Sequence, residues 1–129
     1  MRSNSLDFEI RFYERIVQEK PDYVDALSLL AQAYTTRKQY QKGLGIDQRL
    51  ARLCPEDPLV FYNLACSHAL LGQKREALQA LEQAAALGYR DFNYMLKDAD
   101  LKSLREEARF LKLLQSKPKR RKSHEEFNP

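Results

Sequence analysis

The sequence predicts an all-α fold in which helix–turn–helix units stack side by side as a solenoid. Three observations lead to this prediction. A unit of about 34 residues occurs twice, so that Pro21 and Pro55 occupy equivalent positions. Within each unit, apolar residues recur at i, i+3, i+4 and i+7, which is the spacing of one helix face. Five prolines and four glycines in 129 residues leave little material for long loops.

The two units match in register along their whole length. Helices are expected at about 23–36 and 40–53 in the first unit, and at 58–71 and 73–87 in the second. Asp57 is the expected N-cap of the third of these helices, and Gly88 ends the fourth. The equivalent pairs are Leu27 and Phe61, Leu30 and Leu64, Ala31 and Ala65, Tyr34 and His68, Leu44 and Leu78, and Leu53 and Leu87.

A single amphipathic helix at 6–19 precedes the two units, and shorter helices between 91 and 115 follow them. Asp91 and Asp98 are the expected N-caps of the shorter helices. Because the last unit has no neighbour on one side, its apolar face needs a cover. The residues predicted to cover it are Met95, Leu101, Leu104, Phe110 and Leu113.

These patterns resemble the tetratricopeptide repeat (TPR) family. The residues that carry the resemblance are Leu27-x2-Leu30-Ala31-x2-Tyr34, Phe61-x2-Leu64-Ala65-x2-His68, Gly72 and Ala77-x3-Leu81-x2-Ala84. Residues 88–114 resemble the closing segment at the C-terminal end of many bacterial TPR groups. The resemblance implies a right-handed solenoid of antiparallel helix pairs in a single domain, residues 1–115. That domain divides into a half-repeat at 6–20, repeats at 21–54 and 55–88 and a closing segment at 89–115, with a disordered basic tail at 116–129.

The first repeat departs from the family pattern at Asp47 and carries two glycines inside its second helix. Asp47 stands where an aromatic residue is usual, and we expect it to loosen this repeat. Gly43 is expected at a close approach between two helices, whereas no packing reason is evident for Gly45. Each glycine inside a helix costs about 1 kcal/mol relative to alanine.

The sequence favours no catalytic, metal or cofactor site. It contains no Gly-rich phosphate loop, no G-x-S-x-G, no H-E-x-x-H and no paired Cys-x-x-Cys. His68 stands at a packing position of the repeat, so a structural role is expected. Cys54 and Cys66 are expected to be free thiols in a reducing cytoplasm. The chain has no apolar run long enough for a membrane span, and its start lacks the features of a signal peptide.

The TPR resemblance implies a binding groove on the inner helices of the repeats. The positions that line it in the family correspond to Asp25, Ser28, Leu29, Gln32 and Thr35, and to Leu59, Tyr62, Asn63, Cys66 and Leu70. From these we predict Ser28, Gln32, Tyr62, Asn63, Cys66 and Leu70 as the binding residues. The expected ligand is a peptide or a helix of a partner protein, bound by a monomer or a weak homo-oligomer.

Two of these residues have both a binding and a structural interpretation. Asn63 matches a position whose amide binds ligand backbone, and Tyr62 would be a rigid aromatic anchor. Alternatively, Asn63 is bonded within the chain or merely solvated, and Tyr62 is a packed tyrosine. Ser28 and Gln32 replace the lysine and asparagine with which one TPR variant captures a terminal carboxylate, so that mode of recognition is disfavoured.

The C-terminal tail supports an alternative function. Residues 117–129 carry a net charge of +3, which leaves +1 for residues 1–116. The basic run is interpreted first as a solvated tail, with weak anion binding or a localisation address as the other interpretations. The alternative function is therefore a nucleic-acid- or anion-associated protein that acts through the tail. Nucleic acid is the less favoured partner, because no aromatic residue is interleaved with Lys117–Lys122 to stack on bases.

Overall fold

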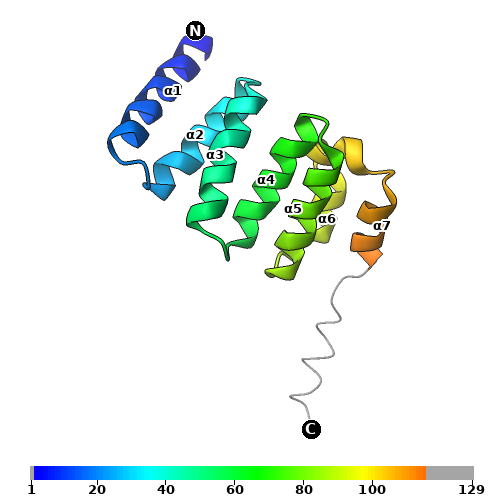
Figure 1. Cartoon of the computed structure of the whole chain (residues 1–129). Helices are drawn as coiled ribbons and strands as arrows, with labels where there is room; N and C mark the ends of the chain where they lie inside the picture. Colours follow the sequence, from blue (N-terminus) through cyan, green and yellow to red (C-terminus); the bar gives the residue numbers. More distant parts are fainter. Residues whose placement is uncertain (1, 116–129) are drawn as a thin grey trace.

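The computed structural model describes residues 2–115, and within this range it contains seven α-helices, one short 3-10 helix and no strand (Figure 1). The all-α prediction is therefore confirmed. The basic tail, predicted to be disordered, lies outside the described residues. The elements are α1 (Arg2–Glu19), α2 (Val24–Thr36), α3 (Tyr40–Leu53), α4 (Pro58–Leu70), α5 (Lys74–Ala86), α6 (Phe92–Lys97), η1 (Ala99–Leu104) and α7 (Ala108–Gln115).

The helix boundaries follow the sequence closely, with one exception at the N-terminus. Helices α2 to α5 begin and end at, or one residue inside, the predicted limits. Helix α1, in contrast, begins at Arg2 and not at Leu6. The expected start was wrong because no glycine or proline lies between Arg2 and Ser5, so nothing in the backbone stops the helix from continuing.

The predicted caps are confirmed. The Asp57 carboxylate accepts a hydrogen bond from the backbone N–H of Leu59 at 2.9 Å, and Asp91 accepts one from Tyr94 at 3.0 Å. These bonds satisfy N–H groups that a helix start leaves without a partner. At Gly88, which follows α5, the backbone φ is +120°, a conformation that residues with a Cβ rarely adopt.

Each helix from α1 to α5 packs against the next one in the sequence, which gives a row of helices (Figure 1). Helix α4 contacts α3, α5 and η1. Its residues are shared between two hydrophobic clusters: Val60 belongs to the N-terminal cluster with α1, α2 and α3, while Ala65 and Ala69 belong to the C-terminal one. Met95, Leu101, Leu104 and Phe110 are fully buried in the C-terminal cluster, as predicted for the cover of the last unit.

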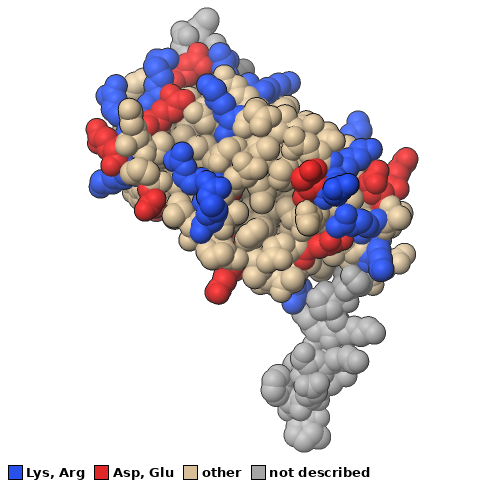
Figure 2. Space-filling model, viewed as in Figure 1, with Lys and Arg blue, Asp and Glu red and all other residues tan. Residues whose placement is uncertain are grey.

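Charged side chains gather toward the two ends of the face seen in Figure 2, and an uncharged band separates them. None of the described helices is both long and apolar enough to cross a membrane.

The helices of the first repeat meet closely at Gly43, as predicted. A Cβ atom on Gly43 would lie 3.3 Å from Oγ1 of Thr35 in α2, whereas one on Gly45 would have no neighbour within 4 Å. In the second repeat, Ala77 and Ala84 of α5 are completely buried. Small residues at these positions let neighbouring helices approach each other.

The packing predicts that Ala77→Leu destabilises the protein, because extra methylene groups have no space at a fully buried position. We expect the free energy of unfolding to fall by ~1–3 kcal/mol in a denaturant titration. Ala86→Leu, at an exposed position of the same helix, is the matched control and should change little. Equal stabilities for the two variants would show that the register assigned to α5 is wrong.

Candidate functional site

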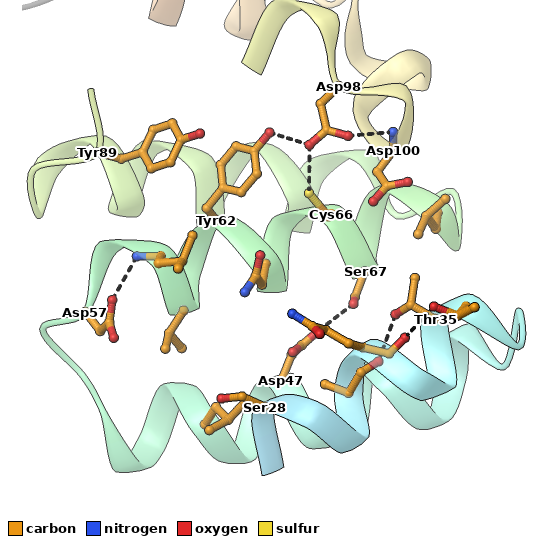
Figure 3. A pocket seen from close by; sticks show the side chains of 18 of the residues that line it. Ser28, Thr35, Asp47, Asp57, Tyr62, Cys66, Ser67, Tyr89, Asp98 and Asp100 are labelled. Carbon is orange, nitrogen blue, oxygen red and sulfur yellow. Dashed lines mark hydrogen bonds between the residues drawn. The ribbon is translucent and has the colours of Figure 1, made fainter. Parts of the chain in front are cut away.

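A groove with a volume of about 550 Å³ lies between α2, α3, α4 and the closing segment, residues 89–115 (Figure 3). All six predicted binding residues, Ser28, Gln32, Tyr62, Asn63, Cys66 and Leu70, line it. Thr35 and Leu59 line it as well, while Asp25 and Leu29 do not. The structure therefore brings the predicted residues of both repeats to one surface.

The six residues differ in the exposed fraction of their side chains, which limits what a ligand can contact. Gln32 and Asn63 are exposed, and Ser28 and Leu70 are partly buried. Tyr62, in contrast, is only 3% exposed and Cys66 only 8%. The exposed contact surface is therefore provided by the first group and by Leu59, whereas Tyr62 and Cys66 form the wall behind it.

Tyr62 is a packed tyrosine rather than a free anchor. Its hydroxyl donates a hydrogen bond of 2.5 Å to Oδ2 of Asp98, which lies between α6 and η1 (Figure 3). Burial and this carboxylate raise the pKa of Tyr62 well above its ordinary value. Of the two interpretations that the sequence leaves open for Tyr62, the structural one describes its geometry.

The Asp98 carboxylate joins three parts of this region. Besides the bond from Tyr62, Oδ2 lies 3.7 Å from Sγ of Cys66, which donates to it, and Oδ1 accepts from the backbone N–H of Asp100 at 3.0 Å. The last bond caps η1, as predicted for Asp98. One side chain thus starts η1 and fastens it to α4.

Three tyrosines form the aromatic end of the groove. The rings of Tyr62 and Tyr89 stack with centroids 4.5 Å apart and an interplanar angle of 8°. The Tyr94 ring lies 6.2 Å from that of Tyr62 and is tilted by 44°. Tyr94 is 53% exposed, so it is the member of the cluster that an incoming molecule can contact.

The contribution of the closing segment to this groove is not predictable from the sequence. Tyr89, Tyr94, Asp98 and Asp100 all line it, although their sequence pattern indicates only capping and coverage of the core. Their proximity to α4 depends on how the chain folds back after Gly88, for which the sequence carries no local signal.

The Cys66 thiol lies in an environment that opposes formation of a nucleophilic thiolate. Its sulfur lies within 4.8 Å of carboxylate oxygens from Asp98 and Asp100, a spacing compatible with metal coordination. Coordination requires the thiolate, which a bound cation would itself stabilise. Burial and the charges of the two aspartates, however, raise the pKa of Cys66 strongly. The arrangement favours a protonated thiol that donates to Asp98.

Asp47 is the buried carboxylate on the opposite side of the groove. It is 5% exposed and accepts a 2.5 Å hydrogen bond from the hydroxyl of Ser67 in α4. Burial raises its pKa to about 6, although the Ser67 hydrogen bond and the nearby His68 act in the opposite direction. His68 itself shares a 2.8 Å hydrogen bond through Nδ1 with Oε1 of Gln73. This bond is consistent with the structural role expected for His68.

No family model matches this chain. A stretch of 61 residues is 43% identical to a protein of Arabidopsis thaliana whose name describes it as chloroplastic. The matched stretch is 46% of this chain and 18% of that relative. The similarity therefore concerns a small part of a much longer protein.

We predict that Asp47 makes stability depend on pH. Its pKa rises from 3.8 in the unfolded chain to about 6 in the fold, so the folded state binds the proton more tightly. The stabilisation is complete below about pH 4 and is lost as the pH rises through about 6, a change of up to about 3 kcal/mol.

Asp47→Asn keeps an acceptor for Ser67 and removes this titration. Denaturant titrations at pH 4 to 8 should show a variant that is more stable than the wild type near pH 7 and has a flatter pH profile. Asp22→Asn, which changes an exposed carboxylate, should keep the wild-type profile. An unchanged slope in Asp47→Asn would refute the assignment.

We also predict that Tyr62→Phe loosens the closing segment, because it removes one of the three donors to the Asp98 carboxylate. The loss in unfolding free energy should be about 1–2 kcal/mol, and hydrogen exchange should accelerate in α6 and η1. Tyr23→Phe, at an exposed tyrosine outside the groove, should have no such effect. If both variants exchange like the wild type, the Tyr62–Asp98 bond does not hold the segment.

Proposed function

We propose that this chain is a non-enzymatic scaffold of the TPR kind, a right-handed solenoid that holds a peptide or a helix of a partner protein in its groove. The observation that carries the proposal is the convergence of six residues, chosen from the positions that the TPR resemblance implies, on one hollow of about 550 Å³. A volume of this size accommodates several side chains of a ligand.

The composition of the groove surface supports a peptide ligand. Asn63 and Gln32 offer exposed amides that can hydrogen-bond an extended backbone, and Leu59 and Tyr94 offer exposed apolar area beside them. Such a mixture of a few polar groups with apolar contacts is typical of sites that bind by shape and hydrogen bonding. The protonated thiol of Cys66 and the engaged ring of His68 favour binding over catalysis.

We propose a reducing compartment, the cytoplasm, and a monomer or weak homo-oligomer. Both cysteines are free, which supports a reducing environment. The name of the relative places that protein in the chloroplast, which makes the chloroplast the alternative for this chain.

The competing function runs through the basic tail, residues 117–129, which lies outside the described residues. Binding that depends on the tail would be electrostatic and would weaken steeply with added salt. Groove binding depends more on buried contacts, which salt screens less. The two functions can therefore be separated with one partner and two salt concentrations.

We predict that Tyr94→Ala weakens the binding of a partner captured from the source organism by about thirtyfold, as expected for an exposed aromatic that contributes ~2 kcal/mol. Tyr94 is the residue to test, because truncation of the buried Tyr62 would also disturb the fold. Tyr23→Ala is the matched control on a tyrosine outside the groove.

Deletion of residues 117–129 should leave the affinity for this partner nearly unchanged at moderate salt. Affinities measured by calorimetry at two salt concentrations decide between the functions. If Tyr94→Ala binds like the wild type while tail deletion abolishes binding, the groove proposal is replaced by the tail function.

A further inference from the structure

We propose that the groove selects a basic ligand, a peptide segment that carries lysine or arginine side chains next to apolar ones. The inference rests on the proposed function and names the chemistry of its partner. It is drawn from the charges that line the groove and from the apolar and aromatic area between them.

The lining of the groove carries negative charge and no cationic side chain, and the nearby Arg105 guanidinium donates to the backbone carbonyl of Asp98 at 3.1 Å and not to its carboxylate. Asp47, Asp57, Asp98 and Asp100 are among its twenty lining residues, and none of the twenty is lysine, arginine or histidine. The ion pairs found among residues 2–115 are Arg37 with Asp7, Lys74 with Glu107 and Arg109 with Glu82, so they involve none of the four carboxylates. The negative lining is local, because residues 1–116 have a net charge of only +1.

The close pair Asp98 and Asp100 shows where a cation would be most favourable. Both line the same end of the groove, and oxygens of the two carboxylates lie within 4.8 Å of Sγ of Cys66 and of each other. Burial and the neighbouring charge of Asp98 raise the pKa of Asp100. A ligand cation between them would offset this repulsion, and an anion would increase it.

Tyr94 adds a surface for the same cation. Half of its side chain is exposed, and the pKa of its hydroxyl is raised chiefly by the charge of Asp98. The ring therefore lies in the negative field of that carboxylate. A guanidinium or ammonium group over an exposed aromatic face gains cation–π attraction as well as the attraction of the carboxylates.

The rest of the groove indicates a peptide rather than a lone ion. Leu59, Val60 and Leu70 contribute apolar lining, and the volume of about 550 Å³ far exceeds that of a single cation. Apolar side chains of a peptide can cover these residues while its basic side chains reach the aspartates. Alternating basic and apolar residues would meet both requirements.

The test uses the full-length protein and three labelled peptides measured by fluorescence anisotropy. One peptide alternates lysine and leucine, and in the other two glutamate or glutamine replaces lysine. We expect the lysine peptide to bind, the glutamine peptide to bind at least tenfold more weakly and the glutamate peptide not to bind. The chain's own basic segment, Lys117–Lys122, attracts an acidic peptide and repels a basic one, so its effect opposes the expected order and cannot produce it.

Two variants locate the binding. Asp100→Asn should weaken the lysine peptide about fivefold or more, while Glu106→Gln removes the same charge from an exposed residue outside the groove and should not. Asp100→Lys should abolish binding of the lysine peptide. Circular dichroism and thermal unfolding check that each variant is folded. If Asp100→Lys misfolds, the comparison of Asp100→Asn with Glu106→Gln still decides the question.

Four outcomes would overturn the inference, and they separate it from the proposed function. If the glutamine or glutamate peptide binds as tightly as the lysine peptide and Tyr94→Ala weakens all of them, the groove binds peptides without selecting for charge. If Asp100→Asn and Glu106→Gln weaken the lysine peptide equally, its attraction is a general property of the surface. If the lysine peptide does not bind, the charge inference fails, while partner affinity in Tyr94→Ala still decides the function. If Asp100→Asn binds like the wild type, the pair of aspartates is not the cation site.

Discussion

The C-terminal half of this structure depends on the hydrogen bonds that the carboxylate of Asp98 accepts. This carboxylate caps η1 through the N–H of Asp100 and accepts hydrogen bonds from Tyr62 and Cys66 of α4. The cap and the link to α4 come from one side chain, so η1 cannot start at Asp98 without being drawn toward α4. The same contact places Tyr94 and Asp100 at the edge of the groove. A residue that sequence analysis assigns to helix capping therefore also shapes the candidate binding surface.

Helix α4 receives this contact because it is buried on several sides. It packs on α3, α5 and η1, and its residues belong to both hydrophobic clusters. Because α4 contributes residues to both hydrophobic clusters, it fixes their positions relative to each other. Asp47 and Ser67 connect α3 to the same helix by a buried hydrogen bond. Asp47 and Asp98 thus lie on either side of α4, and both of these structural carboxylates also line the groove.

The sequence predicts the helices well because the signals for them are local. Apolar spacing, the Asp57 and Asp91 caps and the positive-φ glycine after α5 act within a few residues, and they give boundaries correct to about one residue. The start of α1 was missed because a polar segment without glycine or proline carries no signal that stops a helix. Only part of the groove was predicted, because only part of it depends on signals in the local sequence. Ser28, Gln32, Asn63 and Leu70 follow from the groove positions that the TPR resemblance implies, whereas Tyr94 and Asp100 reach the groove through a chain reversal that no periodicity records.

The role of Tyr62 illustrates why position alone does not assign chemistry. Repeat register places it on the inner face of α4, where an aromatic side chain is equally suited to hold a partner or to hold the fold. The choice between these depends on whether a polar group elsewhere in the chain reaches its hydroxyl, and Asp98 does so across 36 positions of sequence. Once the hydroxyl is bonded and the ring stacked on Tyr89, little of Tyr62 remains for a ligand. Tyr94 is therefore the exposed aromatic side chain of the groove, and it lies beside two carboxylates. The contact that fixes the closing segment is therefore also what gives the groove its negative, aromatic end.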